Sequence, residues 1–315
     1  MASSVTRHKK IVLALIITLA AFSLARPSYR VLEIDGLERR YLVSEPRNLD
    51  TPMPCILVLH GGGGNARQMS RQGFSRLSKE HGFLVIYPEG LDKHWNDGRY
   101  DREAPIAKRE SNDVKFLDSL LTELESQYPI DPDKIFCMGI SNGAFMSHRL
   151  GLELSHRLAG IVPIIGGVNL TVKENFPPKA PLSVMIIQGV DDPIVPYEGG
   201  AVRLVETGKT RGTVLPTEEA FTMWSEHNKC ETPTTQTLAD TTDDGCQVTL
   251  MSAQNGSDQT EVLLYSIEGG GHTVPGGSQY LPVKLIGKVC HDLDAVDLVA
   301  EFCRPAPPPS ARSAL

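Results

Sequence analysis

A serine stands between two glycines in Gly139-Ile140-Ser141-Asn142-Gly143, directly after the apolar run Lys134-Ile135-Phe136-Cys137-Met138. An apolar strand that ends in Gly-x-Ser-x-Gly and passes at once into a helix presents a nucleophilic serine on a sharp turn. Glycines are needed because β-carbons two residues either side of the serine would collide there. The alternative is an ordinary strand-to-helix loop. Because a helical stretch follows at residues 144–152, we predict that Ser141 is a nucleophile.

A nucleophilic serine needs a base and an acid that orients this base. His272 lies between Gly270-Gly271 and Gly276-Gly277, on a loop open enough for an imidazole to reach the serine. Asp191 and Asp192 follow an apolar run, and from the residues alone either can orient the imidazole or merely cap a turn. The order serine, aspartate, histidine is that of α/β hydrolases.

The glycine run His60-Gly61-Gly62-Gly63-Gly64 ends another apolar strand. Glycines in this place let backbone N–H groups approach a carbonyl oxygen, so Gly62 and Asn142 are expected to form an oxyanion hole. The alternatives are a flexible turn and a phosphate-binding loop, although the Lys-Ser/Thr pair of a P-loop is absent from the sequence. No HExxH, CxxC or Cys/His zinc spacing occurs in the sequence, so neither a metal nor a cofactor is expected.

Apolar runs alternate with amphipathic segments, which predicts a mainly parallel α/β sheet with helices on both faces. After a hairpin around Asp35-Gly36, strands are expected at residues 55–60, 83–87, 134–138, 160–165, 183–187 and 262–267. Helices are expected at residues 112–124, 144–152, 218–228 and 294–302. Hydrophobic residues make up 41% of the chain, enough for one core, so residues 26–303 are predicted to form a single domain.

Residues 1–25 have the pattern of a secretory signal peptide: a basic start, an apolar run at 11–21 and Ser23-Leu24-Ala25 for cleavage. An uncleaved N-terminal anchor is the alternative. Cleavage would remove three basic residues and no acidic one, so the net charge would fall from −7 to −10. We therefore expect a secreted or periplasmic protein that binds neither nucleic acid nor, stably, a membrane. Residues 304–315 are expected to form a disordered tail.

All six cysteines follow this cleavage point, and an even number in an exported chain favours disulfides. Local spacing predicts the pairs Cys230–Cys246 and Cys290–Cys303. The other two lie in apolar strands and are expected to be small buried hydrophobic residues: Cys55 and Cys137.

Taken together, these segments resemble the secreted esterases related to polyhydroxybutyrate depolymerases and to feruloyl and acetylxylan esterases. The resemblance extends from about Arg39 to Phe302. Its motifs are Leu59-His60-Gly61-Gly62-Gly63-Gly64, Tyr87-Pro88-Glu89-Gly90, Trp95-Asn96-Asp97, Asn112-Asp113-Val114, Gly139-Ile140-Ser141-Asn142-Gly143, Asp192-Pro193-Ile194-Val195-Pro196-Tyr197 and Gly270-Gly271-His272-Thr273-Val274-Pro275-Gly276. It implies an α/β-hydrolase fold with a triad of Ser141, His272 and Asp192, the aspartate that stands four residues before Pro196.

The resemblance also implies an ester substrate, either a small molecule, a polyester or an ester linked to a polysaccharide. Trp95 resembles a family position near the mouth of the active site, where it would stack on an aromatic or sugar ring; the alternative is a hydrophobic plug in a long loop. The chain departs from the family at Gln188, often histidine, and at Val274, often tryptophan. A serine peptidase and a catalytically inactive binding module remain alternative functions, because the fold serves many functions.

Overall fold

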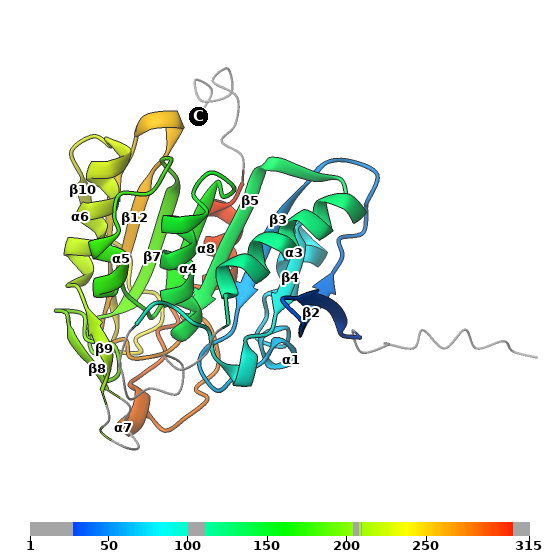
Figure 1. The fold of residues 1–315 in the computed structure, drawn as a ribbon. Helices are drawn as coiled ribbons and strands as arrows, with labels where there is room; N and C mark the ends of the chain where they lie inside the picture. Colours follow the sequence, from blue (N-terminus) through cyan, green and yellow to red (C-terminus); the bar gives the residue numbers. More distant parts are fainter. Residues whose placement is uncertain (1–27, 100–110, 204–207, 209, 305–315) are drawn as a thin grey trace, which may run out of the picture.

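The computed structural model describes residues 28–99, 111–203, 208 and 210–304. The strands are β1 (Arg30–Ile34), β2 (Leu37–Ser44), β3 (Met53–Leu59), β4 (Leu84–Pro88), β5 (Ile130–Ile140), β6 (Gly160–Ile164), β7 (Ser183–Gly189), β8 (Gly200–Arg203), β9 (Thr210–Val214), β10 (Thr234–Thr237), β11 (Gln247–Ala253) and β12 (Val262–Glu268). Ten of them form one sheet in the order β1-β2-β4-β3-β5-β6-β7-β12-β11-β10 (Figure 1). Neighbours from β4 to β12 pair in parallel, whereas both ends of the sheet are antiparallel.

Helices cover both faces of this sheet. They are α1 (Ala66–Met69), α2 (Ser75–His81), α3 (Asp113–Gln127), α4 (Asn142–Glu153), α5 (Leu170–Glu174), α6 (Thr217–Asn228), α7 (Val283–Ile286) and α8 (Ala295–Phe302), with short 3-10 turns η1 (Leu91–Lys93) and η3 (Ser257–Gln259). Helices α3, α4 and α6 pack on one face, and α1, α2 and α8 pack on the other. Figure 1 shows α3, α4 and α6 in front of the sheet and α8 behind it. The predicted α/β-hydrolase architecture is confirmed.

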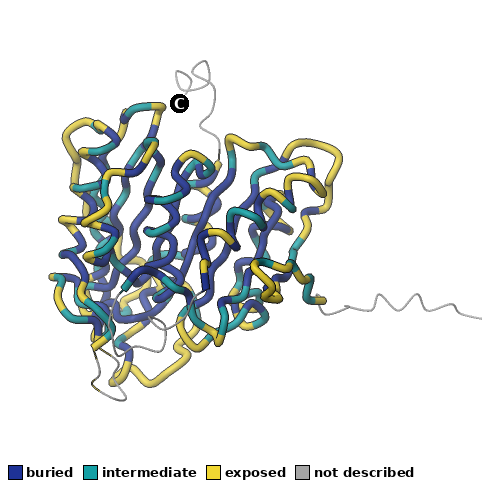
Figure 2. Tube along the Cα trace, in the orientation of Figure 1, coloured by how far each residue is buried: buried dark blue, intermediate teal, exposed yellow. Residues whose placement is uncertain are grey.

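The central strands are buried on both sides, as their continuous apolar sequences require. Along β3, Cys55 and Leu57 face the core under α3 and α4, whereas Ile56 and Val58 face the core under α2 and α8. Side chains of a strand alternate between its two faces, so one short apolar run contributes to both cores. The buried strands run through the middle of the molecule in Figure 2.

The helix boundaries follow local signals in the sequence. Asn112 caps α3, because its side chain accepts a hydrogen bond from the backbone N–H of Lys115. Asp294 caps α8 in the same way through two backbone N–H groups. The predicted helices at residues 112–124, 144–152, 218–228 and 294–302 are each present within a few residues. The small β8–β9 sheet, the edge strand β10 and its neighbour β11 were not predicted, because their residues are too polar to show an apolar run.

The two predicted disulfides are wrong, because the fold keeps the two cysteines of each predicted pair apart and neither pair is joined. Cys230 lies beside the last residues of β11, where the Glu231 N–H donates to the Gln254 carbonyl, whereas Cys246 directly precedes the first residue of this strand. Seven extended residues, roughly 20 Å, therefore separate the two thiols. Helix α8 similarly separates Cys290 from Cys303. The strand and the helix hold residues apart that a flexible loop would have allowed to meet.

Two further predictions, a signal peptide and a disordered tail, concern the ends of the chain. The predicted signal peptide at residues 1–25 lies outside the described residues, as does the predicted tail except Arg304. Among the described helices, none is both long and apolar enough to span a bilayer.

Candidate active site

Ser141 occupies the turn between β5 and α4 in the strained conformation that the sequence predicts. Its backbone dihedrals are φ 53° and ψ −118°, a region that residues with a side chain rarely adopt. A β-carbon on Gly139 would lie 2.1 Å from the Gly143 carbonyl oxygen, and one on Gly143 would lie 2.5 Å from the carbonyl oxygen of Leu59. The two glycines are therefore required by contact, and the turn lifts the Ser141 side chain above the sheet.

His272 joins Ser141 to an acid. Its Nε2 lies 3.0 Å from Ser141 Oγ, and its Nδ1 lies 2.7 Å from Asp192 Oδ2. The carboxylate can only accept, so the Nδ1–H donates to Asp192 and leaves Nε2 to accept from the serine hydroxyl. His272 and Asp192 are both buried. The structure thus brings the three predicted residues together across 131 positions of sequence between Ser141 and His272.

The neighbouring aspartates have different surroundings. Asp192 is buried, and its Oδ1 accepts hydrogen bonds from the backbone N–H groups of Ile194 and Val195 at 2.8 and 2.9 Å. Asp191 is exposed and accepts from the backbone N–H of Gly269 at 2.8 Å. The choice that the residues alone left open is therefore decided by direction, because only Asp192 contacts the imidazole.

Gln188 supports Asp192 from the end of β7. Its Nε2 donates to Asp192 Oδ2 at 3.1 Å and to the Val195 carbonyl at 3.2 Å. The sequence singled out this position only as a departure from the family pattern. Its amide holds the second carboxylate oxygen in the orientation that faces His272.

The loop that carries His272 is held by a strap formed by residues 286–290. The Gly271 N–H donates to the Lys288 carbonyl at 3.0 Å, and the Gly276 N–H donates to the Cys290 carbonyl at 2.8 Å. The His272 N–H donates to the Ile286 carbonyl. The loop is therefore ordered by backbone hydrogen bonds on both sides of the imidazole, although its glycine-rich sequence suggested flexibility.

Gly62 and Asn142 lie side by side next to the serine. A β-carbon on Gly62 would lie 3.6 Å from the Asn142 β-carbon, and both residues line the same pocket. Among the described residues, no acceptor takes a hydrogen bond from either backbone N–H. Two adjacent unpaired N–H groups beside a nucleophile are suited to bind a developing oxyanion.

The Asn142 side chain connects the turn at Ser141 to the loop at residues 95–97 through hydrogen bonds. Its Nδ2 donates to Asp97 Oδ2 at 2.6 Å, and its Oδ1 accepts from the Trp95 backbone N–H at 2.8 Å. Asp113 holds the same loop by accepting from the Asn96 N–H at 2.6 Å. From sequence alone, Asn96, Asp97 and Asp113 only marked the family resemblance, and this contact network gives them a structural role.

The predicted contact of Trp95 with substrate is wrong. Its side chain is fully buried, its indole N–H donates to the His60 carbonyl at 2.9 Å, and it does not line the pocket around Ser141. The indole belongs to the core under α3 and α4 and packs against the His60 ring at 5.0 Å between centroids. Trp95 is therefore the hydrophobic plug that sequence reasoning held as the alternative.

A large open pocket surrounds Ser141 and His272. Its walls combine apolar side chains from the β8 region and the strap with polar groups from the glycine turn and α1, among them Gln68, Arg71, His94, Arg99, Phe145, Ile194, Val202, Arg211, Val274, Tyr280 and Leu285. Val274 lies in this wall, where the family often has tryptophan. A smaller side chain leaves a wider space beside His272.

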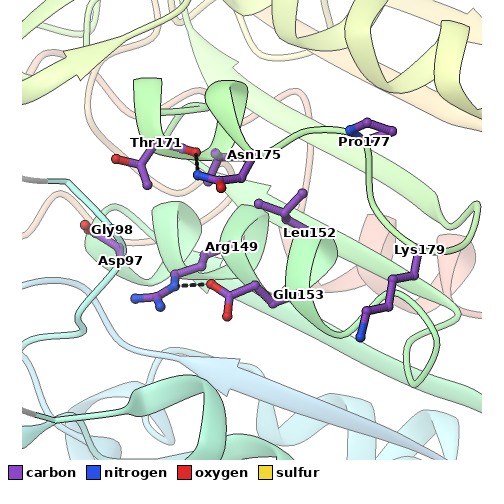
Figure 3. Close-up of a pocket in the computed structure, with 10 residues that line it drawn as sticks. Asp97, Gly98, Arg149, Leu152, Glu153, Thr171, Asn175, Pro177 and Lys179 are labelled. Atoms are coloured by element: carbon purple, nitrogen blue, oxygen red, sulfur yellow. Dashed lines mark hydrogen bonds and ion pairs between the residues drawn. The ribbon is translucent and has the colours of Figure 1, made fainter.

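A second cavity lies between α4 and α5, away from Ser141 (Figure 3). Its polar groups are bonded to one another: Arg149 Nε donates to Glu153 Oε1 at 2.6 Å, and Asn175 Nδ2 donates to the Thr171 carbonyl at 2.8 Å. Among the described residues that line this cavity, no nucleophile is paired with a base, so we assign no chemistry to it.

Comparison with known proteins decides the family. A family model described as phospholipase/carboxylesterase matches residues 47–231, more than half of the chain. The chain belongs to the phospholipase/carboxylesterase family. It therefore carries a carboxylesterase-type hydrolase domain, as predicted. The matched segment of this carboxylesterase includes Ser141 and Asp192 but ends before His272.

Individual relatives of the carboxylesterase are distant. It is 27% identical over 79% of its length to the NocK protein of Nocardia uniformis subsp. tsuyamanensis, which carries an esterase name, and covers 73% of that protein. It is 26% identical over 76% of its length to feruloyl esterase B of Piromyces equi, of which it spans only 43%. A poly(3-hydroxyalkanoate) depolymerase of Paucimonas lemoignei is 25% identical over 39% of the chain and 30% of the depolymerase.

Solved structures show the same fold. An acetyl xylan esterase from Aspergillus awamori aligns with a TM-score of 0.54 at 15% identity, over 88% of this chain and 98% of that one. A phospholipase/carboxylesterase from Dyadobacter fermentans aligns with a TM-score of 0.52 at 17% identity, over 84% and 96%.

Proposed function

We propose that this protein is an exported serine esterase that hydrolyses carboxylic esters through Ser141, His272 and Asp192. The observation that carries the proposal is the chain of two hydrogen bonds from Ser141 Oγ through His272 to Asp192. Export rests on the sequence of residues 1–25, and N-terminal sequencing of protein recovered outside the cytoplasm tests it. A mature protein that still begins at Met1 would contradict export by cleavage.

In the proposed mechanism, Ser141 Oγ attacks the ester carbonyl while His272 Nε2 takes the hydroxyl proton. The N–H groups of Gly62 and Asn142 donate to the oxyanion of the tetrahedral intermediate. His272 returns the proton to the departing alcohol, which leaves an acyl group on Ser141. Water then attacks the acyl-enzyme by the same route and releases the acid. Asp192 fixes the imidazole tautomer and stabilises its positive charge, so no cofactor takes part in these steps.

Replacement of the nucleophile tests this assignment. Ser141→Ala should abolish labelling by a fluorophosphonate and lower kcat by about 10⁴-fold or more. Ser126→Ala is a matched control, because Ser126 is exposed on α3 and bonds only to the Glu123 carbonyl. Mass spectrometry that finds the label on another serine would contradict the proposal. A wild-type protein that takes no label would instead indicate an inactive binding module.

The ester must be distinguished from the amide, since the same fold supports peptidases. Paired aryl-ester and aryl-amide substrates with identical acyl groups give this comparison. We expect kcat/KM for the ester to exceed that for the amide by at least 10³-fold. A panel of feruloyl, acetyl-xylan, short-chain aryl and hydroxybutyrate-oligomer esters would then identify the acid and alcohol halves.

A further inference from the structure

Two buried thiols meet close to the proposed active site. Cys246, just before β11, and Cys290, just before α8, are 3% and 1% exposed. Their sulfur atoms lie within 4.8 Å of each other. Each belongs to a different loop, and His272 lies between the two in sequence. A covalent link here would therefore close a ring that contains His272.

The two loops already hold each other by their backbones. Asp244 accepts at one carboxylate oxygen from the Cys246 N–H at 2.9 Å and at the other from the His291 N–H at 2.7 Å. Asp292 accepts from the Thr241 N–H at 2.7 Å. These bonds join the residues just before Cys246 to those just after Cys290, so the closeness of the sulfur atoms does not depend on one mobile side chain.

The Cys290 loop is also the end of the strap behind His272. The Cys290 carbonyl accepts from the Gly276 N–H, and Lys288 accepts from Gly271 two residues earlier. On the other side, Cys246 leads into β11, whose first residue Gln247 pairs with Glu268 at the end of β12. A disulfide between the two sulfur atoms would thus link the strap covalently to the start of β11 in the main sheet.

We propose that Cys246 and Cys290 form a disulfide that fastens the strap behind the His272 loop. The importance of that loop rests on the proposed catalytic function, and formation of the bond in the cell rests on the proposed export, whereas formation of the bond in the refolded chain depends on neither. The thiolate of one cysteine attacks a disulfide oxidant such as glutathione disulfide, forms a mixed disulfide and releases one thiol. The second thiolate attacks the protein sulfur of this mixed disulfide and releases the second thiol. The two cysteines lose two protons and two electrons, and the oxidant is reduced to two thiols.

Burial raises the pKa of both thiols, so little thiolate is present in the folded protein at neutral pH. Oxidation should therefore be fastest while the chain folds. A metal ion is the competing occupant, because Asp244 is the third possible ligand of this cluster. Both of its carboxylate oxygens already accept backbone hydrogen bonds, which favours the disulfide over the metal.

The test uses the mature chain, refolded once with reduced and oxidised glutathione and once with dithiothreitol. In denaturant, alkylation followed by mass spectrometry should count four free thiols in the oxidised protein and six in the reduced one. Non-reducing peptide mapping should join the peptides of Cys246 and Cys290. Reduction should lower Tm by about 5–10 °C, as expected for a bridge that closes a ring of this size.

Matched variants separate the bond from other effects. The double variant Cys246→Ser/Cys290→Ser should have the same Tm with and without reductant. Cys230→Ser should keep the reductant-sensitive shift, because Cys230 lies at the far end of β11. The catalytically inactive Ser141→Ala variant should form the same bridge. The disulfide test can therefore be interpreted even if the protein is not an esterase.

Three results would overturn the proposal. These are six free thiols after oxidative refolding, a mapped bridge between other cysteines, and thiols that alkylate in glutathione but become protected by stoichiometric zinc added alone.

Discussion

The Asn142 side chain donates to Asp97 at 2.6 Å and accepts from the backbone N–H of Trp95, so the residue after the nucleophile is tied to a loop 45 positions away. The backbone N–H of the same residue is one of the two proposed oxyanion donors. The contact therefore controls where this donor points. A donor is useful only when it is aimed at the position that the oxyanion will occupy.

Loss of this contact should lower the rate more than it weakens substrate binding. Asn142→Asp places a carboxylate against Asp97. The repulsion between the two carboxylates should displace the turn at Ser141 enough to lower kcat about 10²-fold. KM should change less than threefold. Steady-state kinetics on an aryl ester measure both constants, and circular dichroism checks that the fold is intact. A large rise in KM with an unchanged kcat would contradict the positioning role.

The two neighbouring aspartates should differ sharply in their effect. Asp192→Asn removes the acceptor for the imidazole Nδ1–H and should lower kcat by about 10²- to 10⁴-fold. Asp191→Asn alters only an exposed turn and should lower kcat less than threefold. The two variants are compared at saturating substrate. If Asp191→Asn were the more damaging change, the assignment of the acid would be wrong.

Trp95 should matter for stability and not for substrate choice. Trp95→Phe removes the donor to the buried His60 carbonyl and leaves a cavity, which should lower the free energy of unfolding by about 1–3 kcal/mol. KM for aromatic and aliphatic esters should change by the same small factor. Urea unfolding and a two-substrate KM comparison test this. A selective loss of affinity for aromatic esters would instead indicate that Trp95 stacks on the substrate.

His148 should make the protein less stable in mild acid. The ring is buried against Trp224, neither nitrogen has a hydrogen-bond partner among the described residues, and burial lowers its pKa to about 3. The unfolded chain binds a proton here below about pH 6.5, whereas the folded chain does not, so stability is present above pH 6.5 and falls as the pH drops toward 3. Between pH 7 and pH 5 this costs about 2 kcal/mol.

Urea unfolding at the two pH values isolates the contribution of this histidine. His148→Phe keeps an aromatic ring against Trp224 and should remove about 2 kcal/mol of the pH-dependent loss. Ser126→Ala provides the control, because it removes no titratable group from an exposed position and should leave the pH-dependent loss unchanged. An equal loss in wild type and His148→Phe would show that His148 binds its proton equally in both states.

The charge of the pocket should favour anionic esters. Its described lining includes Arg71 and Arg211 and no aspartate or glutamate, although the whole chain is acidic. Arg99 also lines the pocket, but its guanidinium is paired with the Asp97 carboxylate and adds little net charge. An ester that carries a carboxylate should therefore have a KM several-fold lower than a neutral ester of equal length, and added salt should reduce the difference. Arg71→Gln should reduce the difference between the KM values of the anionic and the neutral ester. Equal KM values at low salt would contradict the prediction.

The sequence alone determined the parts of this protein that depend on local geometry. The glycines around Ser141 are readable as a strained turn, because the steric conflict lies within five consecutive residues. Strands buried on both faces are readable as apolar runs. The family register also selected Asp192 before its contact with His272 was seen.

Only the tertiary structure decided which distant residues meet. The sequence left Trp95 open between a stacking residue at the active-site mouth and a hydrophobic plug, and it is the plug, because its ring is buried and its indole N–H donates to the His60 carbonyl. Cys246 was expected to pair with Cys230 and lies beside Cys290, because β11 holds the first two apart while the loops at its other end converge. Such pairings depend on which loops share an edge of the sheet, and that follows from strand order, which local sequence does not encode.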